Sequence, residues 1–125
     1  MNNVISEYLK KQFEWGVSDC CMFAADIILA KSGVDLADGY RGTYTSKSES
    51  VDAIAEFDSL VELLDSNFDR IYNINLAQRG DVVTFKGGNG VGVIWSGCIL
   101  SMNPDHKGLV KALDEVEFVW RITNV

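Results

Sequence analysis

The stretch from Trp15 to Ile28 (WGVSDCCMFAADII) joins a glycine turn and two short polar residues to a pair of cysteines and an apolar run. Either Ser18 or Asp19 can accept a hydrogen bond from an otherwise free backbone N–H group at the start of a helix. The apolar residues that follow recur at helical spacing, so the pattern predicts a helix over Cys20–Lys31. Such a helix has to bury its apolar face in the core of the protein.

Cys20 falls in the first turn of this predicted helix. Free N–H groups and the positive end of the helix dipole favour an anion there, so a thiolate is favoured over a thiol. A cysteine nucleophile is often built in this way, although cysteine is also among the most frequently buried residue types. Adjacent helical residues point about 100° apart. We therefore expect Cys20 to face outward and Cys21 to pack in the core beside Ala24, Ala25 and Ile28.

The remaining chain divides into a helical first half and a strand-rich second half. Further helices are predicted over Met1–Phe13, Glu49–Phe57 and Leu60–Ser66, and Gly33 is placed to end the cysteine helix. Asp38–Ser46 is a polar loop that either borders a cleft or is a solvated connection. Short runs of β-forming residues predict strands over Val82–Phe85, Val91–Trp95, Cys98–Met102, Leu109–Leu113 and Phe118–Ile122.

Four segments of the chain resemble parts of the NlpC-type cell-wall peptidases, which are small papain-like cysteine hydrolases. The resemblance extends from about Phe13 to Ile122 and is greatest to a phage and prophage branch with the pattern Trp-Gly-x-x-Asp-Cys-Cys-x-Phe-Ala-Ala-Asp. The four segments are the nucleophile segment Trp15–Asp26, the turn and first strand Arg79–Val83, the second strand Val91–Ile94, and the closing strand Trp120–Ile122.

The resemblance implies a fold and a site. The fold is α+β, a papain-like NlpC-type domain with N-terminal helices packed on a five-stranded, mostly antiparallel sheet. The site has Cys20 as the nucleophile of a peptidase or amidase that cleaves peptidoglycan stem peptides. Backbone N–H groups near Cys20 would hold the oxyanion.

The general base of that family is replaced in this chain. In the family, a histidine directly precedes the Val-Gly-Val/Ile strand, whereas here that position is Gly90, and the single histidine of the chain is His106. A cysteine hydrolase needs a partner that takes and returns a proton. His106 is therefore the candidate base, either folded back over Gly90 or solvated in a turn.

A hairpin turn at Ser96-Gly97 fixes which residues would surround the Gly90 position. It pairs Trp95 with Cys98 and, continued along the strands, Gly92 with Ser101 and Gly90 with Asn103. Since alternate residues of a strand share a face, the sequence predicts that Gly90, Gly92, Ser101 and Asn103 line the face on which the base is expected.

Composition limits the partners and the redox state. The chain has 125 residues and a formal net charge of −7, and its 11 basic residues form no cluster, which argues against nucleic acid and anionic membranes. The length and the 47% hydrophobic content predict one domain over residues 1–125. No signal peptide or transmembrane segment is recognisable. Three cysteines, two of them adjacent, and no spaced ligands predict neither a disulfide framework nor a metal or cofactor.

Two functions of different class follow from these sequence features, and a third is also considered. In the first, the protein is a structural or assembly component of a phage tail with a degenerate hydrolase site; Gly90 favours this. In the second, it is an active cysteine peptidase or amidase with Cys20 and His106 as catalytic residues. Both imply synthesis in the bacterial cytoplasm, location in the virion tail, and other tail proteins or peptidoglycan as partners. The third, a redox-sensing Cys20–Cys21 pair, would require a strained bridge between neighbours.

Overall fold

In the part of the chain that the structure describes, the α-helices precede the strands, which places the protein in the α+β class. The computed structural model describes residues 2–10, 14–39, 41–43, 45–46, 48–49, 60–86, 90–95, 98–102, 109–111 and 115–122. Within these residues the elements, in chain order, are α1 (Asn2–Lys10), α2 (Cys20–Ser32), α4 (Leu60–Asn67), β1 (Asp69–Ile71), the 3-10 helix η1 (Ile74–Leu76), β2 (Val82–Phe85), β3 (Val91–Trp95), β4 (Cys98–Ser101), β5 (Leu109–Lys111) and β6 (Val116–Arg121).

The described strands form one antiparallel sheet in the order β1-β6-β2-β3-β4-β5. The five predicted strands are present as β2 to β6, and the predicted pairing of Trp95 with Cys98 across the hairpin is confirmed. The sheet also contains β1, whose Ile71 pairs with Val119 of β6. β1 is three residues long, which is too short to show a hydrophobic period in the sequence.

The helix that carries the cysteines begins and ends as its sequence predicts. Of the two candidate caps, Asp19 is the one that accepts a hydrogen bond from the backbone N–H of Met22. Gly33 ends the helix in the left-handed conformation with φ 81°, which glycine adopts without steric cost. The predicted helix Glu49–Phe57 extends beyond the described residues, whereas Leu60–Ser66 is confirmed as α4.

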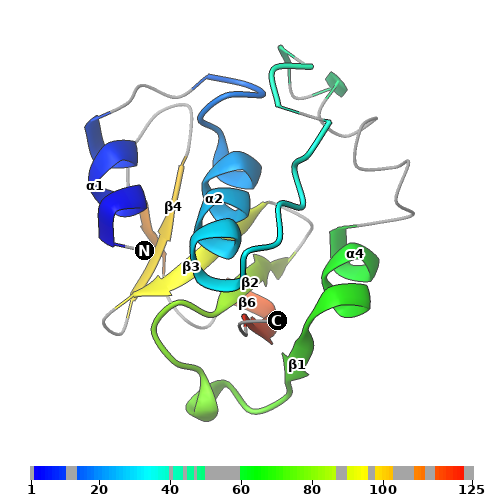
Figure 1. Cartoon of the computed structure of the whole chain (residues 1–125). Coiled ribbons are helices and arrows are strands. Elements are labelled where there is room, and N and C mark those ends of the chain that lie inside the picture. Colours follow the sequence, from blue (N-terminus) through cyan, green and yellow to red (C-terminus); the bar gives the residue numbers. More distant parts are fainter. Residues whose placement is uncertain are drawn as a thin grey trace.

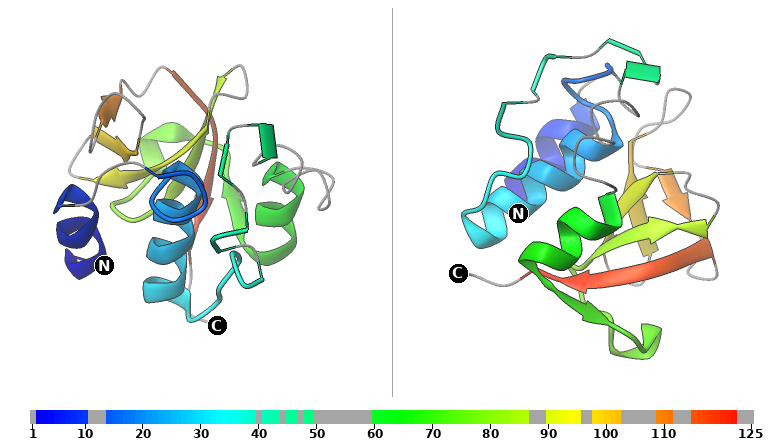
Figure 2. Two further views of the ribbon diagram at one scale, coloured as in Figure 1. Left: turned by 90° about the horizontal axis from the view of Figure 1, so that it is seen from above. Right: turned by 90° about the vertical axis from the view of Figure 1, so that its right-hand side faces the viewer.

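Helices α1, α2 and α4 lie on the same side of the sheet (Figures 1 and 2). Because successive side chains of a strand point to opposite faces of the sheet, the core consists of two clusters, one on each face. On the helix side, Val82, Val91, Val93 and Trp120 pack with Phe23, Ile27 and Ile28 of α2. On the opposite side, Val83, Phe85, Ile94, Ile99 and Val119 form a second cluster. Val91, the first residue of β3, thus packs in the cluster that joins the sheet to α2.

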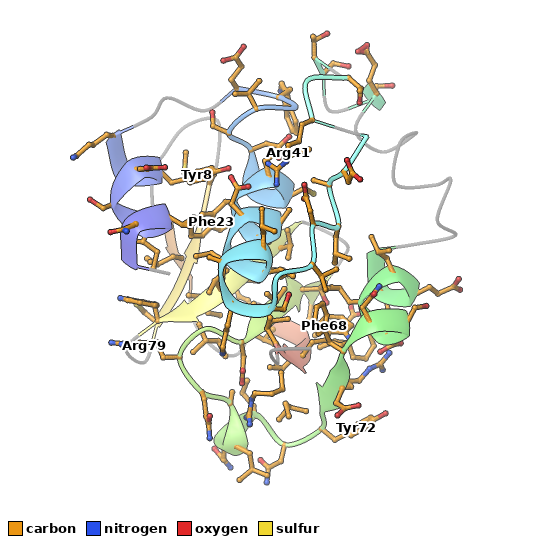
Figure 3. The ribbon with its side chains drawn as sticks, in the orientation of Figure 1. Tyr8, Phe23, Arg41, Phe68, Tyr72 and Arg79 are labelled. Carbon is orange, nitrogen blue, oxygen red and sulfur yellow. The ribbon has the colours of Figure 1, made fainter. Side chains whose placement is uncertain are left out.

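Helix α1 is joined to α2 by an aromatic contact and by a polar one. The rings of Tyr8 and Phe23 have centroids 5.1 Å apart, and Figure 3 shows both side chains between the two helices. The Tyr8 hydroxyl donates a hydrogen bond to Asp26 of α2. Burial, followed by this hydrogen bond to the Asp26 carboxylate, raises the pKa of Tyr8, so the phenol stays protonated.

Candidate functional site

The turn before α2 fixes the position of Cys20. The backbone N–H groups of Val17 and Ser18 both donate to the carbonyl of Glu14. The carboxylate of Asp19, which is 1% exposed, accepts from Met22 N at 2.8 Å and from Gly16 N at 2.9 Å. Asp19 therefore holds both the turn and the first helical residues, and Cys20, the first residue of α2, follows it directly.

Cys20 lies against the residue that directly precedes β3. A Cβ atom built on Gly90 would lie 3.5 Å from Sγ of Cys20, and the backbone N–H of Val91 donates a hydrogen bond to the Cys20 thiol group. The start of α2 therefore abuts the sheet at Gly90. Gly90 is also the position at which the sequence resemblance leads us to expect the base.

The Val91 N–H is available to Cys20 because the β3–β4 ladder stops short of it. The register of the hairpin pairs Val93 with Leu100 and, if it continued, would pair Val91 with Met102, which lies beyond the end of β4. Instead, the Val91 carbonyl accepts a hydrogen bond from Oγ of Ser101 at 2.8 Å. The carbonyl and the N–H of Val91 thus both have partners outside the β3–β4 pairing, the carbonyl in Ser101 and the N–H in the Cys20 thiol.

The two adjacent thiols differ in acidity because they share a hydrogen bond. The Cys21 side chain donates to the sulfur of Cys20, and the backbone N–H groups of Val91 and Cys21 donate to it as well. These bonds outweigh the opposing effect of burial and lower the pKa of Cys20. The same bond with Cys20, together with burial, raises the pKa of Cys21 well above that of a free thiol. The arrangement favours a Cys20 thiolate beside a Cys21 thiol.

The predicted division into an outward Cys20 and a core Cys21 is wrong. Both residues are half-buried, and both pack against the core cluster on the helix side of the sheet. The angle of about 100° between adjacent helical residues applies to their Cα–Cβ bonds. Rotation about χ1 can still bring two neighbouring sulfur atoms within hydrogen-bonding distance. The sequence pattern contained no signal for this rotation.

Gly90 adopts a backbone conformation that other residues rarely enter, with φ +114°. Gly92, two residues on, faces the other side of the sheet, since a Cβ there would lie 2.6 Å from Cγ2 of Ile99 and 3.0 Å from Cζ of Phe85. The prediction that Gly90 and Gly92 share one face is therefore wrong. The positive φ of Gly90 interrupts the alternation just before β3 begins.

The candidate base lies outside the part of the chain that the structure describes. His106 and Asn103 both belong to residues 103–108, so the proposal that His106 reaches Cys20 stays a prediction. Among the described residues, the groups that donate to the sulfur of Cys20 are a thiol and backbone amides. The described part of the site can thus stabilise a thiolate, but it contains no imidazole.

Arg41, in the loop predicted over Asp38–Ser46, has a role that the sequence did not indicate. Its guanidinium pairs with Asp26 of α2 at 2.6 Å and with Asp35 at 3.0 Å. Figure 3 shows the Arg41 side chain beside the N-terminal part of α2. The next residue, Gly42, donates its N–H to the carbonyl of Gly16 at 2.8 Å. This loop therefore braces the turn before Cys20.

Cys98 is separate from the thiol pair. It lies at the start of β4, and its thiol donates to the carbonyl of Trp95 at 2.8 Å. All three cysteines are free thiols. Among the residues whose positions are described, no three histidine, cysteine or acidic side chains form a cluster that could hold a metal ion. Nor is any of the described helices both long and apolar enough to cross a membrane.

The fold and the site define an α+β protein with a thiolate-stabilising cysteine pair where a helix start meets an antiparallel sheet. Residues 1–122 match a family described as "Domain of unknown function (DUF6950)", and the chain belongs to this family. It matches no curated protein and no solved structure.

Proposed function

We propose that this chain is an NlpC-like, papain-like protein associated with the tail of a phage or prophage, where it acts as a structural or assembly component with a degenerate cysteine-hydrolase site. Its partners would be other proteins of the tail, and it would be located in the virion. The proposal starts from the sequence resemblance, in which the order of the nucleophile segment and the strands corresponds to that of the NlpC-type peptidases.

The single observation that carries the proposal is the position of Gly90. Its would-be Cβ lies 3.5 Å from Sγ of Cys20, where the family places its base, yet its φ of +114° is one that residues with a side chain rarely adopt. A degenerate site would show this combination, because the contact between the strand and the nucleophile is kept while the backbone conformation disfavours a side chain, and so a base, at position 90. Amide cleavage also needs an acid that protonates the leaving amine. The hydrogen bond with Cys20, followed by burial, raises the pKa of the neighbouring Cys21, so the Cys21 thiol is a poor donor of that proton.

A second candidate function is supported by the state of Cys20 itself. Hydrogen bonds from the Cys21 side chain and from backbone N–H groups lower the pKa of Cys20, as a nucleophile requires. An active peptidase or amidase acting on peptidoglycan stem peptides would use this thiolate with His106 as its base. This alternative depends on His106 reaching Cys20 from residues 103–108.

Two measurements on the same pair of proteins separate the alternatives. The unmodified chain and Cys20→Ser are each incubated with purified peptidoglycan, and the release of soluble peptides or free amino groups is followed. The same two chains are expressed during phage production, and purified tails are analysed for the chain by mass spectrometry. Cys98→Ser, which alters a thiol outside the site, is the matched control in both measurements.

The structural proposal expects no peptide release by any of the three proteins, and it expects the chain in tails with and without the Cys20 thiol. Peptide release by the unmodified chain and by Cys98→Ser, but not by Cys20→Ser, would instead establish the hydrolase. Tails that lack the chain throughout would overturn its assignment as a tail component.

A further inference from the structure

β1 (Asp69–Ile71) is the outermost strand at one end of the sheet. It pairs with β6 on one side and, among the described strands, with none on the other. The right-hand view of Figure 2 shows it at the lower margin of the sheet. The outer side of an edge strand can pair with a strand of another chain. The backbone and side-chain groups at this edge decide which strand fits it.

The hydrogen bonds of the inner strands show which backbone groups of β1 point outward. Residues of an antiparallel strand direct their N–H and carbonyl groups alternately to one neighbour and to the other. The Phe85 N–H donates to the Gly90 carbonyl, so the odd-numbered residues of β2 bond to β3 and the even-numbered ones to β6. Followed through the β2–β6 and β6–β1 pairings, this alternation directs Asp69 and Ile71 to β6 and Arg70 outward. Within the described residues, the outward groups of Arg70 have no hydrogen-bond partner.

The side chains at this edge are open to a partner, and their charge is balanced. Tyr72, which directly follows β1, is 88% exposed, and Figure 3 shows its side chain projecting away from the rest of the molecule. The Arg70 guanidinium lies 5.8 Å from the centroid of the Tyr72 ring. It also pairs with Asp65 of α4, which offsets a charge that would otherwise guard the edge against a second strand.

We propose that β1 pairs with β1 of a second copy of this chain, antiparallel about a two-fold axis at Ile71, so that the two sheets become one. In this register Arg70 of each copy lies opposite Tyr72 of the other. The backbone groups of both residues point outward by the same alternation, so they bond to each other. Each guanidinium also meets a second aromatic ring, a favourable cation–π contact. The half-buried Ile71 lies against its own copy and loses its remaining exposed surface.

Charge and strand length select this register. The neighbouring symmetric registers that keep outward groups opposed have their axis at Arg70 or at Tyr72. An axis at Arg70 would place two guanidinium groups directly opposite each other, which is destabilising. An axis at Tyr72 would place Arg70 opposite Ile74, which already belongs to η1 and not to an extended strand. The edge is therefore complementary to itself about Ile71, as an interface between two identical copies requires.

The dimer is expected to be weak. β1 has three residues, and interfaces that bury little surface give reversible association. We therefore expect monomer and dimer to exchange, with the dimer populated at high protein concentration. This inference depends on the edge of the sheet alone, and neither Cys20 nor the proposed location in a phage tail enters it.

Sedimentation velocity of the full chain over a range of protein concentrations tests the dimer, with a reducing agent present to keep the cysteines free. We expect a sedimentation coefficient that rises with concentration from that of a monomer toward that of a dimer. A monomer at every concentration would overturn the inference. Growth beyond the dimer would overturn it as well, because pairing of β1 with the opposite edge strand β5 would not close.

Four variants distinguish strand pairing from simple contact between apolar side chains. Tyr72→Pro removes an outward N–H, and Tyr72→Lys places a second cation opposite Arg70. Each should weaken the dimer roughly tenfold or more, because a symmetric dimer contains the change twice. Tyr72→Phe, which keeps the ring and the N–H, should retain it. Leu76→Lys is the matched control: Leu76 is 63% exposed but lies in η1, outside the pairing. A dimer lost in Leu76→Lys and kept in Tyr72→Pro would contradict strand pairing.

Ile71→Cys tests the position of the two-fold axis. Residues that face each other without hydrogen bonds in an antiparallel pair have Cα atoms about 4.5 Å apart, which is within disulfide range. Oxidation of Ile71→Cys with diamide should therefore give a covalent dimer whose disulfide joins the two copies at position 71, as identified by intact mass and peptide mapping. Glu117→Cys is the control, since this exposed residue lies on β6, which is paired on both sides, and should stay monomeric. Equal cross-linking of the two variants would overturn the proposed register.

Discussion

A Cβ atom on Gly90 would lie 3.5 Å from Sγ of Cys20, so the start of β3 and the start of α2 meet at these two residues. The distance is an ordinary van der Waals contact, and a side chain at position 90 would not be excluded by lack of space. It is the backbone, with φ +114°, that favours glycine there.

Replacing Gly90 by alanine should therefore destabilise the protein through its backbone. We expect the free energy of unfolding in urea to fall by about 1–3 kcal/mol, the usual cost of a non-glycine residue in such a conformation. Gly92→Ala should cost more, since its Cβ would overlap Ile99 and Phe85 at 2.6 and 3.0 Å. A neutral Gly90→Ala would mean that the strand start can relax and accept a side chain beside the thiol.

The pH dependence of alkylation should distinguish Cys20 from the other two cysteines. Because the pKa of Cys20 is lowered, its thiolate is populated at a pH where an ordinary thiol is still protonated. Iodoacetamide should therefore modify Cys20 with a midpoint below that of a free thiol at about 8.5. Cys21 should show a midpoint above that value, since its pKa is raised. Peptide mapping across pH 5–10 gives both midpoints, and a reversed order would contradict the assigned donors.

His106→Ala separates the two proposed functions at the level of Cys20. If Cys20 is held only by the Cys21 side chain and backbone N–H groups, the midpoint of its alkylation should not move. If an imidazolium pairs with the thiolate, its removal should raise the midpoint and abolish any amidase activity. Intact-mass measurement of the alkylated protein at several pH values reads the shift directly.

Asp19→Ala should lower stability and disturb the turn before Cys20. The buried carboxylate accepts two backbone hydrogen bonds, from Gly16 and Met22, so its loss leaves two donors unsatisfied. We expect a loss of about 1–3 kcal/mol in urea denaturation. Asp38→Ala, at an exposed position, is the control and should stay within about 0.5 kcal/mol of the unmodified protein. Equal effects of the two changes would contradict the structural role of Asp19.

Thr84→Val should stabilise the protein. The Thr84 hydroxyl is buried and has no hydrogen-bond partner among the described residues, and valine has nearly the same shape. Removing an unsatisfied buried hydroxyl should raise the free energy of unfolding by about 1 kcal/mol. Thr84 pairs with Val91, whose N–H serves Cys20, so the alkylation rate of Cys20 is measured in parallel. A loss of stability would indicate that the hydroxyl is hydrogen-bonded in the protein.

Local patterns predicted the parts of the structure that depend on local physics. The start of α2 after a capping side chain, the end of α2 at Gly33 and the hairpin register at Trp95 and Cys98 each depend on a few neighbouring residues, although Ser18 and Asp19 remained equal candidates for the cap. The meeting of Cys20 with Gly90 was predicted only through the resemblance to a known family, because no local rule joins a helix start to a strand seventy positions away in the chain.

The parts that were missed depend on side-chain rotation or on distant pairing. The hydrogen bond between Cys20 and Cys21 is set by χ1 angles, which the helical period does not specify. The pairing of Arg41 with Asp26 depends on a loop folding back along α2. Each charge alone fits a solvated surface, so no local pattern indicated that the two side chains would pair.

The hydrogen bond from Gly42 to Gly16 makes the segment between them a closed loop whose ends meet beside the turn that precedes Cys20. Its internal contacts, from the Asp19 cap to the Arg41–Asp26 pair, join residues near one another in sequence, which favours rapid local formation. The position of the Cys20 thiol would then depend more on the opening of this loop than on the unfolding of the whole sheet. Hydrogen exchange at the Gly42 amide would report how often the segment opens.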